Sequence, residues 1–268
     1  MEHSKIEWTD HTFNPWIGCA KVNSLCKLCY AETMMDTRYG RVRWGPDGTR
    51  VRTTPDYWRK PFGWNKKAVA AGVRRRVFCA SLADVFEDRR DLVDWRRDLV
   101  DTVIDLTPKL DWLMLTKRPE NIGRMLAAID RCGSGAVRSR SNVWLGASVG
   151  DQATADAGVA ALTRWRPLSP VLFLSVEPLL GPIPHLPLGG IDWVIVGGES
   201  GRGARPMELA WVQNIRDQCR SAGVPFFFKQ WGGVNKSSSG RRLEGRLWDE
   251  LPFVCREQHR PPSLVASP

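Results

Sequence analysis

The sequence predicts an α/β protein built as a single (β/α) barrel, partial or irregular, with six to seven parallel strands. Seven short apolar runs alternate with segments of helical periodicity, a pattern typical of a parallel sheet covered by helices. The length of 268 residues suits one domain of barrel size. A doubly wound open sheet is the alternative, but no G-x-G-x-x-G motif opens any expected helix.

The expected elements are taken from the apolar runs and from the helical periodicity that follows them. A proline at 119, a favourable residue for a first helical turn, begins one of the helices. Strands are expected at 13–17, 76–81, 112–117, 142–148, 171–177, 193–199 and 224–229. Helices are expected at 92–104, from about 119, at 151–165 and at 207–222.

The barrel is expected to occupy residues 1–232, followed by a closing segment and flexible tail at 233–268. A link rich in serine at 236–240 precedes a short ordered segment at 241–252, and the tail begins near 260. No apolar run approaches the ~20 residues that a membrane-spanning helix needs. The N-terminus lacks the apolar stretch of a signal peptide. The sequence therefore predicts a cytoplasmic protein with no membrane partner.

Three of the seven cysteines, Cys19, Cys26 and Cys29, lie within eleven residues at C-x6-C-x2-C spacing. Thiolates prefer zinc, copper(I) or an iron–sulfur cluster. Three cysteines are one fewer than a closed zinc site needs, whereas on a [4Fe–4S] cluster they leave one iron open. The spacing alone does not decide among these metals. The odd total argues against a disulfide framework. The other four cysteines are Cys79, Cys132, Cys219 and Cys255, and most of them are expected to be buried thiols.

A polar residue follows almost every expected strand. Because function in a parallel barrel lies at the carboxyl ends of the strands, these residues are expected to face one shared pocket. One or two of them could be ordinary helix caps, but that explanation does not suit Glu177 and Glu199. This strand-end ring comprises Ser81, Asp84, 116–118, Ser148, Glu177, 199–200 and 229–230.

The positive charge is concentrated in a basic aromatic insert at 38–76. It carries twelve Lys and Arg against Asp47 and Asp56, a surplus that equals the net charge of +10 of the whole chain. Cations neutralise phosphates and aromatic faces stack on bases, so the insert predicts a nucleic-acid partner, DNA or RNA. The alternative is a solvated basic loop whose aromatic residues pack on the domain. Those aromatic residues are Trp44, Tyr57, Trp58, Phe62 and Trp64.

Several segments, spanning residue 5 to about 250, resemble the phage Gp37/Gp68-type family. They are KIEWTDHTFNPWIGC (5–19), CKLCYAE (26–32), LTKRPE (115–120), SVEPL (175–179), VGGESG (196–201) and FKQWG (228–232). A three-cysteine loop after the first strand of a (β/α) barrel also resembles the radical S-adenosylmethionine (SAM) enzymes.

The radical SAM resemblance implies that Cys19, Cys26 and Cys29 hold three irons of a [4Fe–4S] cluster and that SAM chelates the fourth. One electron, from a donor such as ferredoxin or flavodoxin, would cleave SAM to a 5′-deoxyadenosyl radical that abstracts hydrogen from a nucleic acid, in repair or base modification. Lys117 and Lys229 are expected to be catalytic, meeting an anionic substrate group or the SAM carboxylate. SAM is expected to contact Tyr30, Ser81, Asp84, Ser148, Glu177 and Glu199.

Three features depart from the commonest radical SAM pattern. Six residues, not three, separate Cys19 from Cys26, and Leu28 stands where an aromatic residue usually precedes the last cysteine. No Gly-Gly-Glu follows the strand at 76–81. The alternative function is a non-enzymatic zinc module that binds nucleic acid, with His11 as the fourth ligand. That alternative leaves the strand-end ring without a role.

Overall fold

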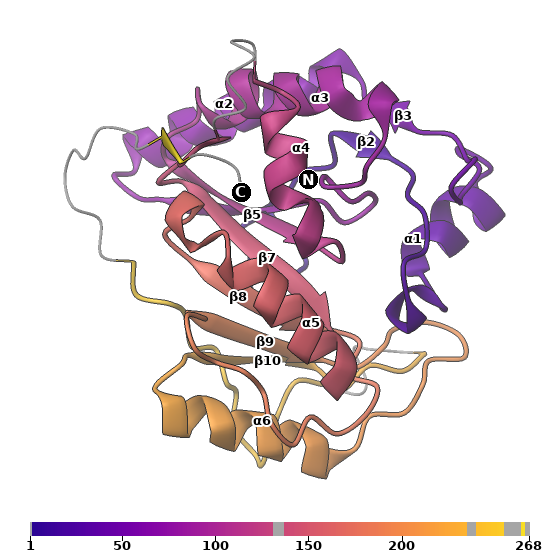
Figure 1. Cartoon of the computed structure of the whole chain (residues 1–268), viewed down its shortest axis with the longest axis vertical. Coiled ribbons are helices and arrows are strands. Elements are labelled where there is room, and N and C mark those ends of the chain that lie inside the picture. Colours follow the sequence, from indigo (N-terminus) through magenta and orange to yellow (C-terminus); the bar gives the residue numbers. More distant parts are fainter. Residues whose placement is uncertain (1, 131–136, 235–239, 255–263, 266–268) are drawn as a thin grey trace.

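The computed structural model describes residues 2–130, 137–234, 240–254 and 264–265. Its main sheet has seven parallel strands that lie side by side in chain order (Figure 1). They are β1 (His11–Thr12), β4 (Arg75–Cys79), β5 (Leu110–Thr116), β7 (Val143–Val149), β8 (Leu172–Val176), β9 (Trp193–Gly197) and β10 (Phe226–Gln230). In a doubly wound sheet the strand order reverses, and here it does not, so that alternative is wrong. β1 and β10 remain the two edges of the described sheet, and the predicted partial barrel is confirmed.

Helices connect these strands on the outer face, because right-handed crossovers in one direction place successive helices on the same side. They are α2 (Pro55–Ala70), α3 (Val93–Arg97), α4 (Ile122–Ala127), α5 (Gln152–Thr163) and α6 (Leu209–Ala222). A 3-10 turn (Arg90–Leu92) and a π-helical stretch (Asp98–Ile104) extend α3, and a 3-10 turn (Pro119–Asn121) precedes α4. Figure 1 shows α5 over β7 and β8 and α6 beside β10. The four predicted helices are therefore confirmed.

Shorter elements surround the sheet. The cysteine loop contains a 3-10 turn (Ser24–Cys26) and α1 (Tyr30–Glu32), which continues as a π-helix (Thr33–Arg38). Two small antiparallel pairs join β2 (Trp16–Ile17) to β3 (Val51–Arg52) and β6 (Val137–Arg138) to β11 (Leu264–Val265). A further 3-10 turn (Arg166–Leu168) follows α5. No helix in the described part of the chain is both long and apolar enough to cross a membrane.

The first predicted strand, at 13–17, is wrong. The strand that joins the main sheet is β1, where His11 pairs with Val77, and residues 16–17 belong to the separate pair with β3. Pro15 explains the interruption, because proline cannot donate the backbone hydrogen bond that a continuous central strand needs. The other six strands begin and end within two residues of their expected bounds.

Helix α2, inside the basic insert, was not predicted. Its sequence contains Pro61 and Gly63, two residues that disfavour helix interiors. The side chain of Thr54 caps it and Pro55 occupies the first turn, and this start signal is present in the sequence. The helix is held by tertiary packing, because Trp58 and Trp64 are both buried against the sheet side.

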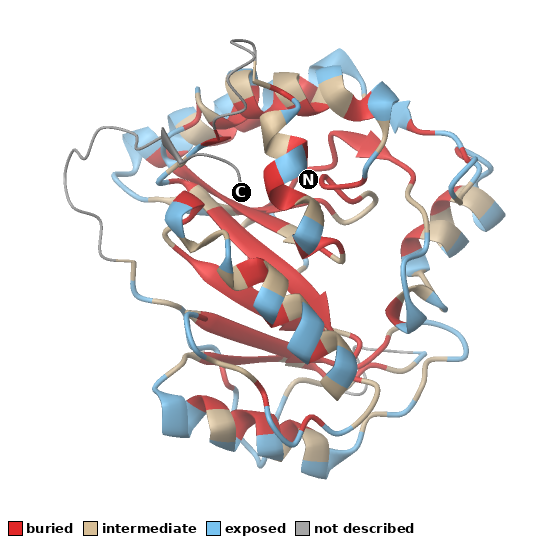
Figure 2. Ribbon diagram, viewed as in Figure 1, coloured by how far each residue is buried: buried red, intermediate tan, exposed pale blue. Residues whose placement is uncertain are grey.

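The two faces of the sheet bury different side chains, and the central strands β8 and β9 are buried along their whole length (Figure 2). Outward-facing residues pack beneath the helices, whereas the inner face carries an aromatic cluster at the early strand positions. That cluster contains Trp8, Phe78, Trp144, Phe173, Trp193 and Phe227. A Cβ on Gly146 would stand 2.3 Å from the Phe173 ring, so glycine is needed there for the ring to fit. The inner face is therefore filled at the amino ends of the strands, and polar side chains follow toward the carboxyl ends.

The segment after β10 packs back onto that strand. The Phe228 N–H donates to the Trp248 carbonyl at 2.9 Å, and the buried Trp248 ring meets Phe226 edge-on with centroids 5.6 Å apart. The division at residue 232 stays a prediction. Most of the expected link at 236–240 and of the expected tail from about 260 lies outside the described residues, which omit 235–239, 255–263 and 266–268.

Candidate functional site

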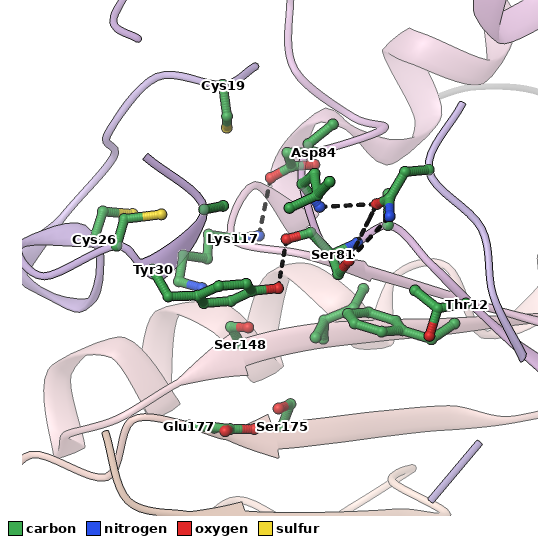
Figure 3. Close-up of a pocket in the computed structure, with 18 of the residues that line it drawn as sticks. Thr12, Cys19, Cys26, Tyr30, Ser81, Asp84, Lys117, Ser148, Ser175 and Glu177 are labelled. Atoms are coloured by element: carbon green, nitrogen blue, oxygen red, sulfur yellow. Dashed lines mark hydrogen bonds between the residues drawn. The ribbon is translucent and has the colours of Figure 1, made fainter. Parts of the chain in front are cut away.

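A cavity of ≈ 910 Å³ opens at the carboxyl ends of the strands (Figure 3). It is lined by the three clustered cysteines and nearly all of the strand-end ring: Cys19, Cys26, Cys29, Tyr30, Ser81, Asp84, Thr116, Lys117, Arg118, Ser148, Glu177, Glu199, Ser200 and Lys229. These residues come together because carboxyl ends of parallel strands share one edge of the barrel. Gln230 is not among the lining residues, and its amide donates to Ser200 Oγ at 2.5 Å. The ring thus shares one cavity, while the individual roles stay predictions.

The cysteine loop owes its position to local backbone contacts. Gly18, with φ 114°, precedes Cys19 and donates its N–H to the Leu82 carbonyl at 3.0 Å. A Cβ there would lie 2.5 Å from the Thr49 carbonyl oxygen, so the close approach requires glycine. Cys26 ends a 3-10 turn capped by Asn23, and Cys29 immediately precedes α1. The three half-buried thiols therefore reach the cavity from three short, separately anchored segments.

Arg118 is the cation closest to the first cysteine. Its Nη1 lies 3.6 Å from Cys19 Sγ and donates to Asp84 Oδ2 at 2.9 Å, while Nη2 donates to the Ala20 carbonyl at 2.8 Å. Burial, with a smaller effect of Asp84, raises the pKa of Cys19 to about 12, and Arg118 opposes that rise. Asp84 also accepts the Thr116 hydroxyl at 2.8 Å, so both of its oxygens are engaged within the chain.

The other two cavity carboxylates are also paired. Glu177 accepts Lys229 Nζ at 2.6 and 2.8 Å, between the ends of β8 and β10. Glu199 accepts Arg205 Nε at 2.8 Å and Nη2 at 2.5 Å. Burial alone would raise the pKa of Glu199, but the hydrogen bonds from Arg205 hold it below its ordinary value. Arg205 also donates to the Ser24 carbonyl at 3.0 Å and so joins the loop after β9 to the cysteine loop.

A chain of hydrogen bonds crosses the cavity wall from Asn14, just after β1, to the cysteine loop. The Tyr30 hydroxyl donates to the Ser81 carbonyl at 2.6 Å, and the Ser81 N–H donates to Asn14 Oδ1 at 2.7 Å. In Figure 3, Cys26 lies on one side of Tyr30 and Ser81, and Thr12 lies on the other. Ser148 and Ser175, which are register partners on β7 and β8, face the space beneath them.

Two residues that build this site were not predicted: Asn14 and Arg205, which position other lining residues. Tyr57 was expected only as an aromatic residue of the basic insert, and it brings α2 to the cavity. Asn14 lies in one of the quoted family segments, which was the available signal. Arg205 follows a Gly-rich turn and carries no such signal in the sequence.

More than half of the cations in the basic insert have a carboxylate partner in the fold. Seven of its twelve cations pair with carboxylates: Arg50, Arg52, Arg59, Lys67, Arg74, Arg75 and Arg76. Arg50 is wholly buried against Glu87 at 2.6 Å. The five cations with no carboxylate partner among the described residues are Arg38, Arg41, Arg43, Lys60 and Lys66.

Four of the aromatic residues in the insert also fall into two groups, two buried in the core and two lining the cavity. Trp58 and Trp64 are buried in the main core, so the packing alternative is correct for them and base stacking by these two rings is excluded. Trp44 is half-buried and lines the cavity, as does Tyr57, whose ring stacks on Phe13 at 5.1 Å.

His11, the proposed fourth zinc ligand, does not line the cavity. Its ring stacks on Trp64 with centroids 4.5 Å apart and an interplanar angle of 10°. Nowhere in the described ranges do three His, Cys, Asp or Glu side chains gather closely enough to hold one metal ion. Of the scattered cysteines, Cys79 and Cys219 are buried as predicted, whereas Cys132 and Cys255 lie outside the described residues.

Comparison with known proteins places the chain in a family. The family model described as "Protein of unknown function (DUF5131)" matches residues 3–252. The chain belongs to this family. The Gp37/Gp68-type resemblance is not established by that match and stays a prediction. No curated protein matches the DUF5131 chain in sequence.

One solved structure is similar to this DUF5131 protein. It is a double mutant of spore photoproduct lyase with bound AdoMet and dinucleoside spore photoproduct, 14% identical, with a TM-score of 0.45. The likeness covers 70% of this chain and 56% of that chain, so the chain spans little more than half of the neighbour's length. A likeness this distant carries no argument about activity.

Proposed function

We propose that this protein is a radical SAM enzyme that acts on nucleic acid, in repair or base modification. Cys19, Cys26 and Cys29 would hold a [4Fe–4S] cluster, and SAM would lie beside it in the cavity. One observation carries this proposal: the three cysteines open into the same cavity as the polar strand-end residues, at the carboxyl edge of a parallel partial barrel.

The donor set fits such a cluster better than it fits a single ion. On a four-iron cluster each cysteine binds a different iron, so three sulfurs need not converge on one point. A single zinc ion needs four convergent ligands, and no convergent group of three is found among the described residues. The raised pKa of Cys19 does not oppose this, because a bound metal displaces the thiol proton and Arg118 already contacts that sulfur.

When bound, the cluster and SAM would supply a hydrogen-abstracting 5′-deoxyadenosyl radical, formed by one-electron cleavage of the carbon–sulfur bond of SAM with an electron from a ferredoxin or flavodoxin. The chain's own residues would bind, orient and exclude water. Ser148 and Ser175 offer hydroxyls suited to ribose, and Lys117, with no carboxylate partner among the described residues, suits the SAM carboxylate.

The paired carboxylates take a positioning role in this proposal. Asp84 holds Arg118 against Cys19, and Glu199 holds Arg205 against the cysteine loop. Glu177 and Lys229 neutralise each other in the wall, so a ligand ammonium would have to compete with Lys229 for Glu177.

A nucleic-acid substrate is supported by those cations of the basic insert that have no carboxylate partner among the described residues. Arg38, Arg41 and Arg43 are exposed, and the guanidinium groups of Arg38 and Arg41 lie 5.4 and 5.8 Å from the exposed Tyr39 ring. Such a combination of cations and an accessible aromatic face suits the phosphates and bases of a single strand.

The test is the metal content of anaerobically purified protein. We expect about four irons per chain, lost when any one of the three cluster cysteines is replaced by alanine. The matched control is Cys219→Ala, which removes a buried thiol of α6 outside the cavity and should keep the iron. Reduced wild-type protein should also convert SAM to 5′-deoxyadenosine. Stoichiometric zinc without iron in the anaerobic protein would contradict the proposal.

A further inference from the structure

The cavity extends beyond the cysteines to a second end, formed by β1 and α2. Ser4, Thr12 and Tyr57 line it and are joined by hydrogen bonds: Ser4 Oγ lies 2.8 Å from Thr12 Oγ1, and the Tyr57 hydroxyl donates to the Thr12 carbonyl at 3.2 Å. Two lysines flank this group at the rim. Lys5 follows Ser4 directly, and Lys60 Nζ lies 5.4 Å from the centroid of the Tyr57 ring.

The charges of the cavity do not cancel. Its three lining carboxylates are each paired with a cation, as described above, and they leave no negative charge for other lysines. Lys5, Lys60 and Lys117 also line the cavity, and none of them has a carboxylate partner in the part of the chain that the structure describes. Three unneutralised lysines at one cavity favour an anionic occupant.

The three lysines lie at different ends. Lys117 belongs to the cysteine end, because its backbone N–H donates to Asp84 at 3.2 Å and the next residue, Arg118, lies 3.6 Å from Cys19 Sγ. Lys5 and Lys60 lie at the β1–α2 end, beyond the hydrogen-bonded wall of Asn14, Ser81 and Tyr30. A cofactor held at the cysteines would use Lys117 and leave the two rim lysines for another molecule.

The floor at this second end is aromatic. Trp8 and Phe78 line the cavity with ring centroids 4.8 Å apart, and the Tyr57 ring forms the wall beneath Lys60. Trp8 and Phe78 are 2% and 7% exposed, so they form an apolar floor and no stacking face, while the two cations match the phosphate of a nucleotide. The volume of ≈ 910 Å³ lies toward the upper end of the roughly 300–1,000 Å³ typical of ligand pockets, so it leaves room for a second molecule beside a cofactor.

We infer that the β1–α2 end of the cavity is the substrate subsite, and that Lys5 and Lys60 bind a phosphate of the nucleotide that is to react. This inference rests on the proposed function, since it names where the substrate of that reaction lies. It differs from the surface contact by Arg38, Arg41 and Arg43, because it places one nucleotide phosphate at the rim of the cavity itself.

The test uses the holoprotein and two labelled probes, a five-nucleotide single strand and a nucleoside 5′-monophosphate. The variant carries Lys5→Gln and Lys60→Gln. We expect it to bind the strand about tenfold more weakly, with the slope of log K against log salt reduced by about 0.7, since one phosphate contact is lost. The matched control is Lys66→Gln, an exposed lysine of the same helix that does not line the cavity, and its affinity should change less than about twofold.

Each remaining outcome decides the inference. Equal loss by the variant and the control, or no loss in the variant, overturns it. Failure of the wild-type protein to bind either probe also overturns it, even where iron content and SAM binding are normal. A weaker affinity of the variant for SAM would assign the lysines to the cofactor and likewise overturn it. Binding of the monophosphate with the same lysine dependence supports a free nucleotide, and binding of the strand alone supports a nucleotide within a chain. Absence of iron contradicts the proposed function but leaves the subsite testable on the apoprotein.

Discussion

Replacement of His11 by phenylalanine tests two things: whether burial of this imidazole makes the protein less stable in acid, and whether His11 is a zinc ligand. The His11 side chain is 6% exposed, stacks on Trp64, and has no hydrogen-bond partner at Nδ1 among the described residues. Burial lowers its pKa from 6.5 to about 4. Phenylalanine keeps a flat ring against Trp64 and removes the titrating group.

The sign and size of the effect follow from proton linkage. The folded chain binds fewer protons at His11 than the unfolded chain does, so this group costs no stability above pH 6.5 and stability is lost as the pH falls toward 4. At 1.36 kcal/mol for each tenfold change in the equilibrium, the full loss is about 3 kcal/mol, of which about 2 kcal/mol is reached near pH 5.

The assay is urea unfolding at about pH 7.5 and about pH 5. Wild-type protein should lose about 2 kcal/mol more between these conditions than His11→Phe does. The matched control is His185→Gln, which changes an exposed histidine and should leave the wild-type loss intact. Equal acid losses in wild type and His11→Phe would refute the reasoning. Metal content should be the same in both proteins, whereas a zinc site with His11 as ligand would be emptied.

Three further predictions concern charge and packing. Asp84→Asn should lower the free energy of unfolding in urea by about 3–5 kcal/mol, because among the described residues it leaves the buried Arg118 guanidinium with only the 3.9 Å carboxylate contact to Glu87; a loss under about 1 kcal/mol would contradict this. Arg41→Glu with Arg43→Glu should weaken binding of a labelled single strand and flatten its salt dependence without loss of iron; unchanged binding would count against the surface contact. Gly146→Ala should cost about 1–3 kcal/mol in the same unfolding assay, since its Cβ would meet the Phe173 ring, and an unchanged midpoint would show that the ring can move.

The order and direction of the strands could be predicted because each strand is a local apolar run followed by its own helix. Six of the seven strands were found from such runs, and their sequential order follows from the repeated strand–helix unit. The shared cavity was predictable for the same reason, since parallel strands bring their carboxyl ends to one edge. The first strand was misplaced because two residues, His11 and Thr12, form no periodic pattern of their own.

Helix α2 shows where local patterns fail. Pro61 and Gly63 weaken its helix propensity, and the helix is stabilised by burial of Trp58 and Trp64 against the core. Burial of this kind depends on what lies opposite in three dimensions, which composition and periodicity do not record.

By itself, the sequence determined the partial barrel, the position of three cysteines in one loop and the ring of polar residues after the strands. Only the tertiary structure decided which charges remain free. Glu177 meets Lys229 across 52 residues, and Arg50 meets Glu87 across 37. Such pairs depend on strand register and on the depth at which each side chain is buried, because a charge removed from water must find a partner. The same pairings leave Lys5 and Lys60 unneutralised at the far rim of the cavity, where the formal charge of the chain gave no indication of them.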